Sequence, residues 1–363
     1  MQNILITGGA GFIGANFVHY WHAQHPGDRL VILDALTYAG NRASLQDLMA
    51  NGAIHFVQGD IRDQALVEQL LREFSIQVIV NFAAESHVDR SIAGPDAFID
   101  TNVVGTHALL KAARQVWLVE LGGLQGHRFH HISTDEVFGS LGPTEPPFTE
   151  RNPFQPNSPY AASKAASDHL VRAYHHTYGL AVTTSNCSNN YGPYHFPEKL
   201  IPLAICRLLL GQTVPVYGDG GNVRDWLFVE DHCRGIELVL QRGKVGETYN
   251  IGGNNERDNL GLVQLLCTIV DQAFQEDASL SRLFPGCPAA RGKGCESAIR
   301  FVTDRPGHDR RYAIDAGKIH QQLGFAPATR FEDGLRRTVG WYLHHRTWWQ
   351  PLLDRTSPTA VNN

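Results

Sequence analysis

The chain has 363 residues, 43% of them hydrophobic and 18% charged, which is an ordinary composition for a globular protein. This length suits one large domain, or a domain plus a smaller lobe. A net charge of −5 with scattered Lys and Arg lacks the basic footprint of a nucleic-acid-binding protein, so we expect no nucleic-acid partner. The 18 His and 6 Cys form no HExxH, CxxC or similar metal-ligand spacing, so we expect no metal.

Nothing in the sequence predicts secretion or a membrane partner. The chain begins with the strand-like QNILITG and shows no apolar signal segment, and no apolar run approaches the roughly 18 residues of a membrane span. We therefore expect a cytoplasmic protein with reduced thiols. A bridge between Cys287 and Cys295, in a loop-like stretch, is the one disulfide that the spacing leaves open.

Short apolar runs rich in β-branched residues alternate with longer amphipathic stretches in the first half of the chain. The runs predict strands at 3–6, 30–33, 54–57, 77–82 and 128–132, and the stretches predict helices at about 13–25, 63–74, 96–118 and 159–178. A further strand, AVTTSN, follows the last of these helices. This βαβα order predicts the α/β class, with a Rossmann-like doubly wound parallel sheet covered by helices on both faces.

The alternating order breaks after residue 190, where Pro and Gly become frequent. We predict an NAD-binding Rossmann domain over 1–190, with segments of about 225–255 returning to it, a smaller mixed lobe over most of 191–350 that binds the substrate, and a frayed tail over 351–363. The segments VPVYGDG and TYNIGG are typical of short strands in such a lobe. LLCTIVDQAF and FEDGLRRTVGWYLHH predict late helices, and 275–300 is expected to be an irregular insertion.

The stretch TGGAGFIG, residues 7–14, follows the first predicted strand and begins a helix. Gly8 permits the tight turn, Gly11 lets the backbone approach a pyrophosphate, and Gly14 lets helix and strand pack closely. The helix N-terminus adds free N–H groups and positive dipole for the anion. Because this pattern directly follows strand one, it indicates a dinucleotide site rather than a glycine-rich turn.

Two acidic residues stand at the ends of the next predicted strands. Asp34 lies 20 residues after Gly14, where a carboxylate would bond the adenosine ribose and repel a 2′-phosphate, which favours NAD over NADP. Asp60 could bond the adenine amino group while Ile61 packs on the ring. For both acids, a role in capping a turn is the simpler alternative.

The motif YAASK places Tyr160 and Lys164 one helical turn apart, on one face. A free Tyr, with a pKa near ~10, is a poor base at neutral pH, but a neighbouring ammonium and a nicotinamide cation favour its phenolate. Such a phenolate can take a hydroxyl proton while hydride leaves to NAD. An exposed Tyr–Lys pair is the simpler alternative. The glycine loop, this pair and Thr134 at a strand end together resemble the extended short-chain dehydrogenase/reductase family, in which that threonine orients the substrate hydroxyl.

The stretch STDEVFGS adds two adjacent carboxylates, Asp135 and Glu136, which simple dehydrogenation does not need. Oxidation at C4 of a hexose acidifies the C5 hydrogen, so one carboxylate can remove it while a carboxylic acid protonates the departing C6 hydroxyl. Return of the hydride to C6 gives a 4-keto-6-deoxy sugar and restores the cofactor. Their surroundings must then keep one carboxyl protonated and the other ionised.

At this level the chain resembles the dTDP-glucose 4,6-dehydratase family. The matching stretches, which span residues 4 to about 318, are TGGAGFIG, LTYAGN, NFAAESHVDRSI, STDEVFG, PYAASKAASDHL, SNNYGPYHFPEKLIP, YGDGGNVRDWLFVEDH and RPGHDRRYAID. The resemblance implies dehydration of dTDP-glucose to dTDP-4-keto-6-deoxy-glucose with tightly bound NAD. It makes Asp135 the acid at C6 and Glu136 the base at C5. Tyr160 is then the base at the 4-hydroxyl, assisted by Lys164 and Thr134.

The same resemblance implies two sets of contacts. Those to the cofactor are Gly8, Gly11, Phe12, Ile13, Gly14, Asp34, Thr37, Asp60, Ile61, Ala83, Ala84, Thr101, Tyr160, Lys164 and Asn190. Those to the sugar nucleotide are Ser86, Thr134, Asn189, Lys199, Leu200, Pro215, Tyr217, Arg224, Asn259, Arg305 and His308. The two arginines suit a diphosphate, although Arg224 could instead pair with Asp225, and Tyr217 could be a core residue rather than a base-stacking one.

Two rival functions use the same fold. Another nucleotide-sugar enzyme, a 4-epimerase or decarboxylase, would keep the Tyr–Lys pair but has no use for Asp135 and Glu136. A non-catalytic dinucleotide-binding regulator would typically lose the Tyr or the Lys. The resemblance also implies a homodimer through the helices near 96–118 and 159–178, whose apolar face would equally suit an interior helix.

Overall fold

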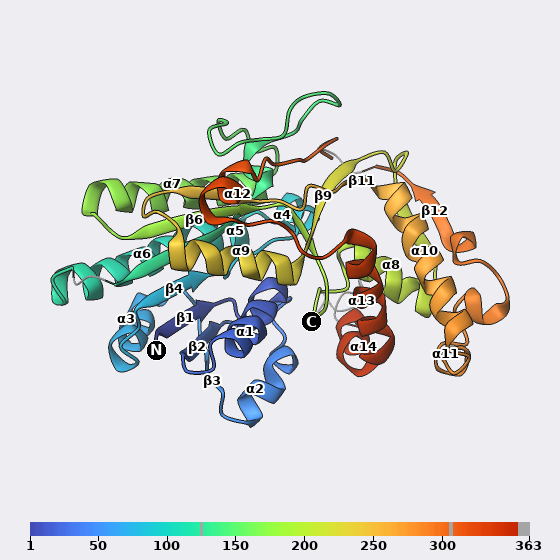
Figure 1. The fold of residues 1–363 in the computed structure, drawn as a ribbon, viewed down its shortest axis with the longest axis horizontal. Coiled ribbons are helices and arrows are strands. Elements are labelled where there is room, and N and C mark those ends of the chain that lie inside the picture. Colours follow the sequence, from blue (N-terminus) through green and yellow to red (C-terminus); the bar gives the residue numbers. More distant parts are fainter. Residues whose placement is uncertain (124–125, 305–307, 355–363) are drawn as a thin grey trace.

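The computed structural model describes residues 1–123, 126–304 and 308–354 (Figure 1). Its main feature is a sheet of seven parallel strands in the order β10-β6-β5-β4-β1-β2-β3. The strands are β1 (Asn3–Thr7), β2 (Arg29–Asp34), β3 (Ile54–Gln58), β4 (Val78–Asn81), β5 (Arg128–Thr134), β6 (Val182–Cys187) and β10 (Thr248–Ile251). All the strands predicted before residue 190 are found here, together with the parallel sheet.

Helices cover both faces of this sheet because successive strand residues point to opposite sides. Ile4 and Ile6 pack into a core with Phe17, whereas Leu5 packs on the other face with Trp117. The first face is covered by α1 (Phe12–Gln24), α2 (Gln46–Ala50), α9 (Val229–Arg242) and α12 (Gly317–Leu323). The second is covered by α3 (Gln64–Glu73), α6 (Thr106–Ala113), η3 (Arg114–Glu120) and α7 (Pro159–Tyr178).

The helix predicted at 96–118 is a run of helical segments. It passes without a break through α5 (Asp96–Phe98), the π-helical η2 (Ile99–Gly105), α6 and the π-helical η3. Shorter helices join the other elements of this half of the molecule, namely η1 (Arg42–Leu45), α4 (Val88–Ala93) and η4 (Asp135–Phe138). The run α5–η3 and α7 lie side by side on the second face.

A smaller lobe, on the right in Figure 1, packs against the carboxyl ends of the strands. It contains the small sheets β11-β9-β7 and β12-β8. Their strands are β7 (Asn189–Tyr191), β8 (Val214–Tyr217), β9 (Val223–Phe228), β11 (Glu256–Asp258) and β12 (Ile299–Val302). The helices are α8 (Leu200–Leu209), α10 (Asn259–Glu276), α11 (Leu280–Leu283), η5 (Ala289–Arg291), η6 (Cys295–Ala298), α13 (Phe331–His344) and α14 (Arg346–Asp354).

Two predictions differ over the stretch TYNIGG. Its pattern is typical of a strand of the lobe, whereas it also falls within the segments of about 225–255 that were expected to return to the Rossmann domain. In the structure β10 pairs with β6 at the edge of the large sheet, so it is not a strand of the lobe. The chain leaves β9 in the small sheet, crosses the large sheet as α9 and enters β10. A four-residue strand does not encode its partner, which this crossover decides.

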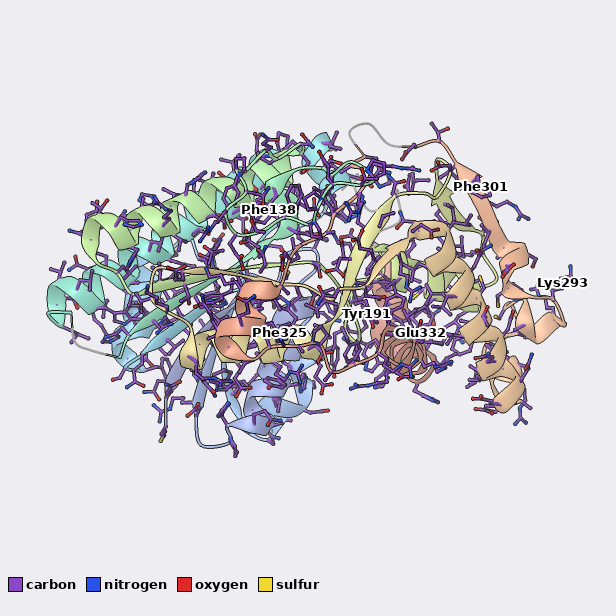
Figure 2. All side chains as sticks on the ribbon, turned by 45° about the horizontal axis from the view of Figure 1, so that its top comes forward. Phe138, Tyr191, Lys293, Phe301, Phe325 and Glu332 are labelled. Carbon is purple, nitrogen blue, oxygen red and sulfur yellow. The ribbon has the colours of Figure 1, made fainter. Side chains whose placement is uncertain are left out.

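Two further details concern the end of the chain. The insertion at 275–300 contains short helices, and Cys287 and Cys295 are buried there with their sulfurs 3.9 Å apart and unbonded. Helix α14 continues to Asp354, so the expected tail does not begin at 351, and Leu352 is buried. Figure 2 shows Tyr191 near the junction of the sheet and the lobe, where its hydroxyl donates to the Phe331 carbonyl at 3.1 Å, and Lys293 on the outer side of the lobe.

Candidate active site

A single cavity of about 670 Å³ brings the predicted residues together at the carboxyl ends of the parallel strands, under the lobe. This is where ligands bind in open α/β sheets. Every predicted cofactor, substrate and catalytic residue lines it except Arg305, which lies outside the described residues. The strand ends carry the glycine loop, Asp34, Asp60, Ala83, Ala84, Thr134, Asp135, Glu136, Asn189 and Asn190, and α7 carries Tyr160 and Lys164.

The glycine loop is packed so closely that side chains do not fit. A Cβ on Gly14 would lie 2.3 Å from the carbonyl oxygen of Gly8, and one on Gly8, at φ +68°, would lie 2.6 Å from the nitrogen of Ala83. Helix α1 then begins at Phe12 with Gly11 as its N-cap and no side-chain cap. Its first N–H groups therefore remain available to an anion in the cavity, as a pyrophosphate requires.

The two acids of the adenosine side differ in their contacts. The carboxyl of Asp34 accepts the N–H groups of Ala10 and Leu36, each at 2.8 Å, and burial raises its pKa. Asp60 accepts the N–H of Arg62 at 2.8 Å and its guanidinium at 2.7 Å. Burial acts to raise the pKa of Asp60, but these bonds to Arg62 lower it overall. The turn-capping alternative therefore holds for both acids, which nevertheless line the cavity.

The Tyr–Lys pair is buried, so the exposed-pair alternative is wrong. Ser158 caps α7 by accepting the N–H of Ala161 at 3.1 Å, which fixes the turn that carries Tyr160. The ammonium of Lys164 donates to the Ile132 carbonyl at 2.7 Å, and burial lowers its pKa to about 8. Burial and the charge of Glu136 raise the pKa of Tyr160 well above its usual value. A phenolate here therefore needs both the ammonium and a cofactor cation.

The two adjacent carboxyl groups have different environments. Strand β5 ends at Thr134, whose hydroxyl oxygen accepts the N–H of Glu136 at 3.2 Å and lies 3.3 Å from Oδ1 of Asp135. Asp135 is almost fully buried, and its Oδ2 has no hydrogen-bond partner among the described residues. Burial, then the charges of Glu136 and Asp225, raise the pKa of Asp135 well above its usual range. These surroundings favour the protonated form of Asp135, beside a carboxyl group that is less deeply buried.

On the substrate side, two alternatives can be decided. Asp225 accepts the N–H groups of Gly253 and Asn255. The Arg224 guanidinium donates to the carbonyls of Val223 and Asp309 and lies 4.3 Å from the ring centre of Tyr312, so its contacts reach beyond Asp225. Tyr217 is 39% exposed, so it is no core residue, and its ring meets His308 edge-on. Arg224 and Tyr217 both line the active-site cavity.

Sequence reasoning missed several residues of the cavity wall, Tyr38, Glu85, His87, Glu198 and Tyr312 among them. Burial raises the pKa of Glu198, whose carboxylate lies 3.3 Å from the Arg90 guanidinium. These residues stand in the stretches LTYAGN, NFAAESHVDRSI, HFPEKLIP and RRYAID. The motifs thus contained the signal, but no spacing rule assigned a role to these positions.

Comparison with known proteins agrees with this geometry. A family model described as GDP-mannose 4,6 dehydratase matches residues 5–338. The dTDP-glucose 4,6-dehydratase of Xanthomonas campestris pv. campestris (strain B100) is 59% identical over 98% of this chain and 97% of its own length. The chain belongs to the dTDP-glucose 4,6-dehydratase family.

Two solved structures show how far the likeness reaches. The dTDP-glucose 4,6-dehydratase of Streptomyces venezuelae, solved with NAD and TYD bound, is 49% identical, with a TM-score of 0.83 over 97% of this chain and all of the other. A UDP-glucose 4-epimerase of Thermotoga maritima is 26% identical, with a TM-score of 0.78 over 94% of this chain and 98% of its own. Enzymes of these two reactions thus share a fold, and the sequence identity of this chain is higher with the dehydratase.

Two features are absent from the described part of the chain. In residues 1–123, 126–304 and 308–354, no cluster of His, Cys, Asp and Glu could hold a metal ion. Within the same ranges, no helix has the length and apolarity needed to cross a membrane.

Gly14→Ala tests the cofactor cradle. The new methyl group would collide with the Gly8 carbonyl, so the loop must open and the purified protein should retain less than about a tenth of the NAD found in the wild type. NAD released by acid denaturation, measured per chain, gives the result. Gly27→Ala is the control because its Cβ would meet nothing within 4 Å. Full retention of NAD by Gly14→Ala would contradict the assignment.

Proposed function

We propose that this protein converts dTDP-glucose to dTDP-4-keto-6-deoxy-glucose and water with tightly bound NAD. The observation that carries the proposal is the buried Asp135, whose pKa is raised, beside Glu136 and in the same cavity as the glycine loop and the Tyr160–Lys164 pair. The identity with dehydratases of that name, and the NAD in their solved relatives, support the substrate and the cofactor.

The proposed mechanism assigns one task to each residue. NAD, when bound, supplies the hydride acceptor for C4 and the donor for C6. Tyr160, as a phenolate favoured by the Lys164 ammonium, removes the proton of the 4-hydroxyl, while Thr134 orients that hydroxyl. Glu136 removes the C5 proton once C4 is a ketone, and Asp135 gives its proton to the departing C6 oxygen. Glu136 then returns the proton to C5.

The two halves of the chain share the binding. In this proposal, residues 1–190 with the returning segments hold NAD, and the lobe within 191–350 holds the sugar nucleotide. Lys199, Tyr217 and Arg224 of the lobe line the cavity, as do Thr37, Ile61 and Thr101 of the first part. Two arginines, Arg224 and Arg305, are assigned to the diphosphate.

The rival functions fit the site less well. A 4-epimerase or decarboxylase would keep Tyr160 and Lys164 but gives no reason to bury an acid such as Asp135 with an unpartnered oxygen. Burying it costs free energy that a reaction needing a proton donor explains. A regulator that only binds a dinucleotide has no use for the buried Tyr–Lys pair.

The first test is incubation of the purified protein with dTDP-glucose and no added cofactor, followed by mass spectrometry of the sugar nucleotide. We expect loss of one water, which requires both dehydration and NAD retained by the protein. Loss of water only from UDP-, GDP- or CDP-glucose would correct the nucleoside. If none of the four loses water even with added NAD, the proposal fails.

Glu136→Gln separates oxidation from elimination. The amide cannot take the C5 proton, but Tyr160 and Lys164 are unchanged, so addition of dTDP-glucose should produce the absorbance of reduced nicotinamide without loss of water. Turnover should fall by about 10² or more. Glu150→Gln is the control because Glu150 lies away from the active-site cavity, and this variant should still convert dTDP-glucose. Absence of any reduced cofactor in Glu136→Gln would place Glu136 in an earlier step.

We also propose that the enzyme is a homodimer through the helical run α5–η3 and α7. Supporting this, large apolar side chains of these segments, and Leu121 directly after η3, are between 44% and 56% exposed; those of the segments are Ile99, Val104, Val119 and Tyr178. Val104→Arg should give a monomer in sedimentation velocity, and Val245→Arg, exposed elsewhere, should not. A wild-type monomer at micromolar concentration would refute the dimer.

A further inference from the structure

Behind the catalytic lysine lies a buried polar cluster to which the proposed mechanism gives no role. Asp168 follows Lys164 by one turn of α7, and His131 of β5 faces both. Nε2 of His131 lies 3.4 Å from the Lys164 ammonium and 3.3 Å from Oδ1 of Asp168. His131 is completely buried, Lys164 is 4% exposed and Asp168 is 7% exposed. A histidine nitrogen thus stands between a buried cation and a buried carboxylate.

The surroundings fix which of these groups carries charge. Asn81 donates to Nδ1 of His131 at 3.2 Å and itself accepts the Thr7 hydroxyl at 2.7 Å, so the imidazole proton belongs on Nε2. Oδ2 of Asp168 accepts the Ser133 hydroxyl at 2.7 Å and the Asn186 amide at 3.4 Å. These donors stabilise an ionised carboxylate.

Burial shifts the pKa values of the other titratable groups around Lys164 toward their neutral forms. Burial lowers the pKa of His131 to about 4, so its ring is uncharged. Burial raises the pKa of the Cys187 thiol on β6 to about 12, and raises that of Tyr160 on α7 well above its usual value. The pKa of Asp135 on η4 is raised for the same reason. The charge of Asp168 is therefore the strongest of those that favour the ammonium of Lys164.

Asp168 also reaches a second cavity. This cavity, of about 880 Å³, is separate from the active-site cavity and is walled by Phe154, His169, Thr184 and Lys318 as well as Asp168. Access to water on that side lowers the cost of an ionised carboxylate in the interior.

Resting on the function proposed above, we propose that Asp168 and His131 are positioning residues for the reaction, and that together they keep Lys164 charged and seated against the Ile132 carbonyl. The Asp168 carboxylate supplies the opposite charge from beneath. His131, neutral and held by Asn81, fills the space between Lys164 and Asp168, excludes water from it and fixes the distance between the two side chains. The simpler alternative is that Asp168 serves only to hold Ser133 in place.

Asp168→Asn separates these two roles because it keeps the shape and removes the charge. The test is the pH dependence of Lys164 acylation by acetic anhydride, read by peptide mass spectrometry, which reports the free amine whether or not the protein turns over. We expect the midpoint, about 8 in the wild type, to fall by about one pH unit, which raises the free amine at a given lower pH about tenfold. The alkaline limb of the kcat profile should move down equally, because activity is lost as Lys164 deprotonates, while KM stays within about twofold.

Two further variants complete the test. Asp231→Asn is the control. Asp231 lies on α9, away from Lys164, is similarly buried and accepts the N–H groups of Ala328 and Thr329. The Lys164 midpoint should therefore not change in this variant. Asp168→Ser removes the same charge, leaves room for water from the second cavity, and replaces Asp168→Asn if that variant does not fold. A Lys164 midpoint unchanged by loss of the Asp168 charge overturns the inference, even if dTDP-glucose is dehydrated. A lowered midpoint without dehydratase activity would keep the coupling and refute the proposed function.

Discussion

The cost of placing charge in a dry interior governs this active site. The strands of the large sheet are buried on both faces, so polar side chains collect at the strand ends, and the lobe then covers those ends. Each ionisable group there responds to the loss of water in its own direction. Asp135 and Tyr160 hold their protons more strongly, and Lys164 holds its proton less strongly. Loss of water thus favours a protonated Asp135, a protonated Tyr160 that needs nearby positive charge to ionise, and a Lys164 that needs nearby negative charge to stay an ammonium.

The lobe takes part in this tuning. Asp225 lies on β9, which belongs to the small sheet, and its charge is among the causes that raise the pKa of Asp135. Its neighbour Arg224 acts in the opposite direction on the same group. The protonation of Asp135 therefore depends on how the lobe is seated. A bound sugar diphosphate that engaged Arg224 would weaken the one nearby charge that opposes the neutral acid.

The sequence predicted what is local and missed what depends on neighbours. TGGAGFIG and YAASK imply their geometry because the turn and the one-turn spacing lie within a few residues. The pairing of β10 with β6 depends on the connection from β9 through α9, and the pattern of TYNIGG alone carries no sign of it. The same holds for His131 and Asp168, since only the fold brings a strand residue beside a helix residue 37 positions later. Burial also answered a question that spacing left open, whether Tyr160 and Lys164 are exposed.

The likeness to a 4-epimerase limits which features of the structure can distinguish a dehydratase. The two folds agree with a TM-score of 0.78, so the backbone alone does not choose the reaction. In the proposed mechanism, oxidation needs only Tyr160, Lys164 and Thr134, whereas loss of water also needs a carboxyl group that keeps its proton near neutral pH. A carboxyl group at the end of β5 meets that need only where it is covered and has another negative charge close by. Asp135 has both, from the lobe above it and from Glu136 beside it, so the dehydration step depends on the dryness of a single strand end.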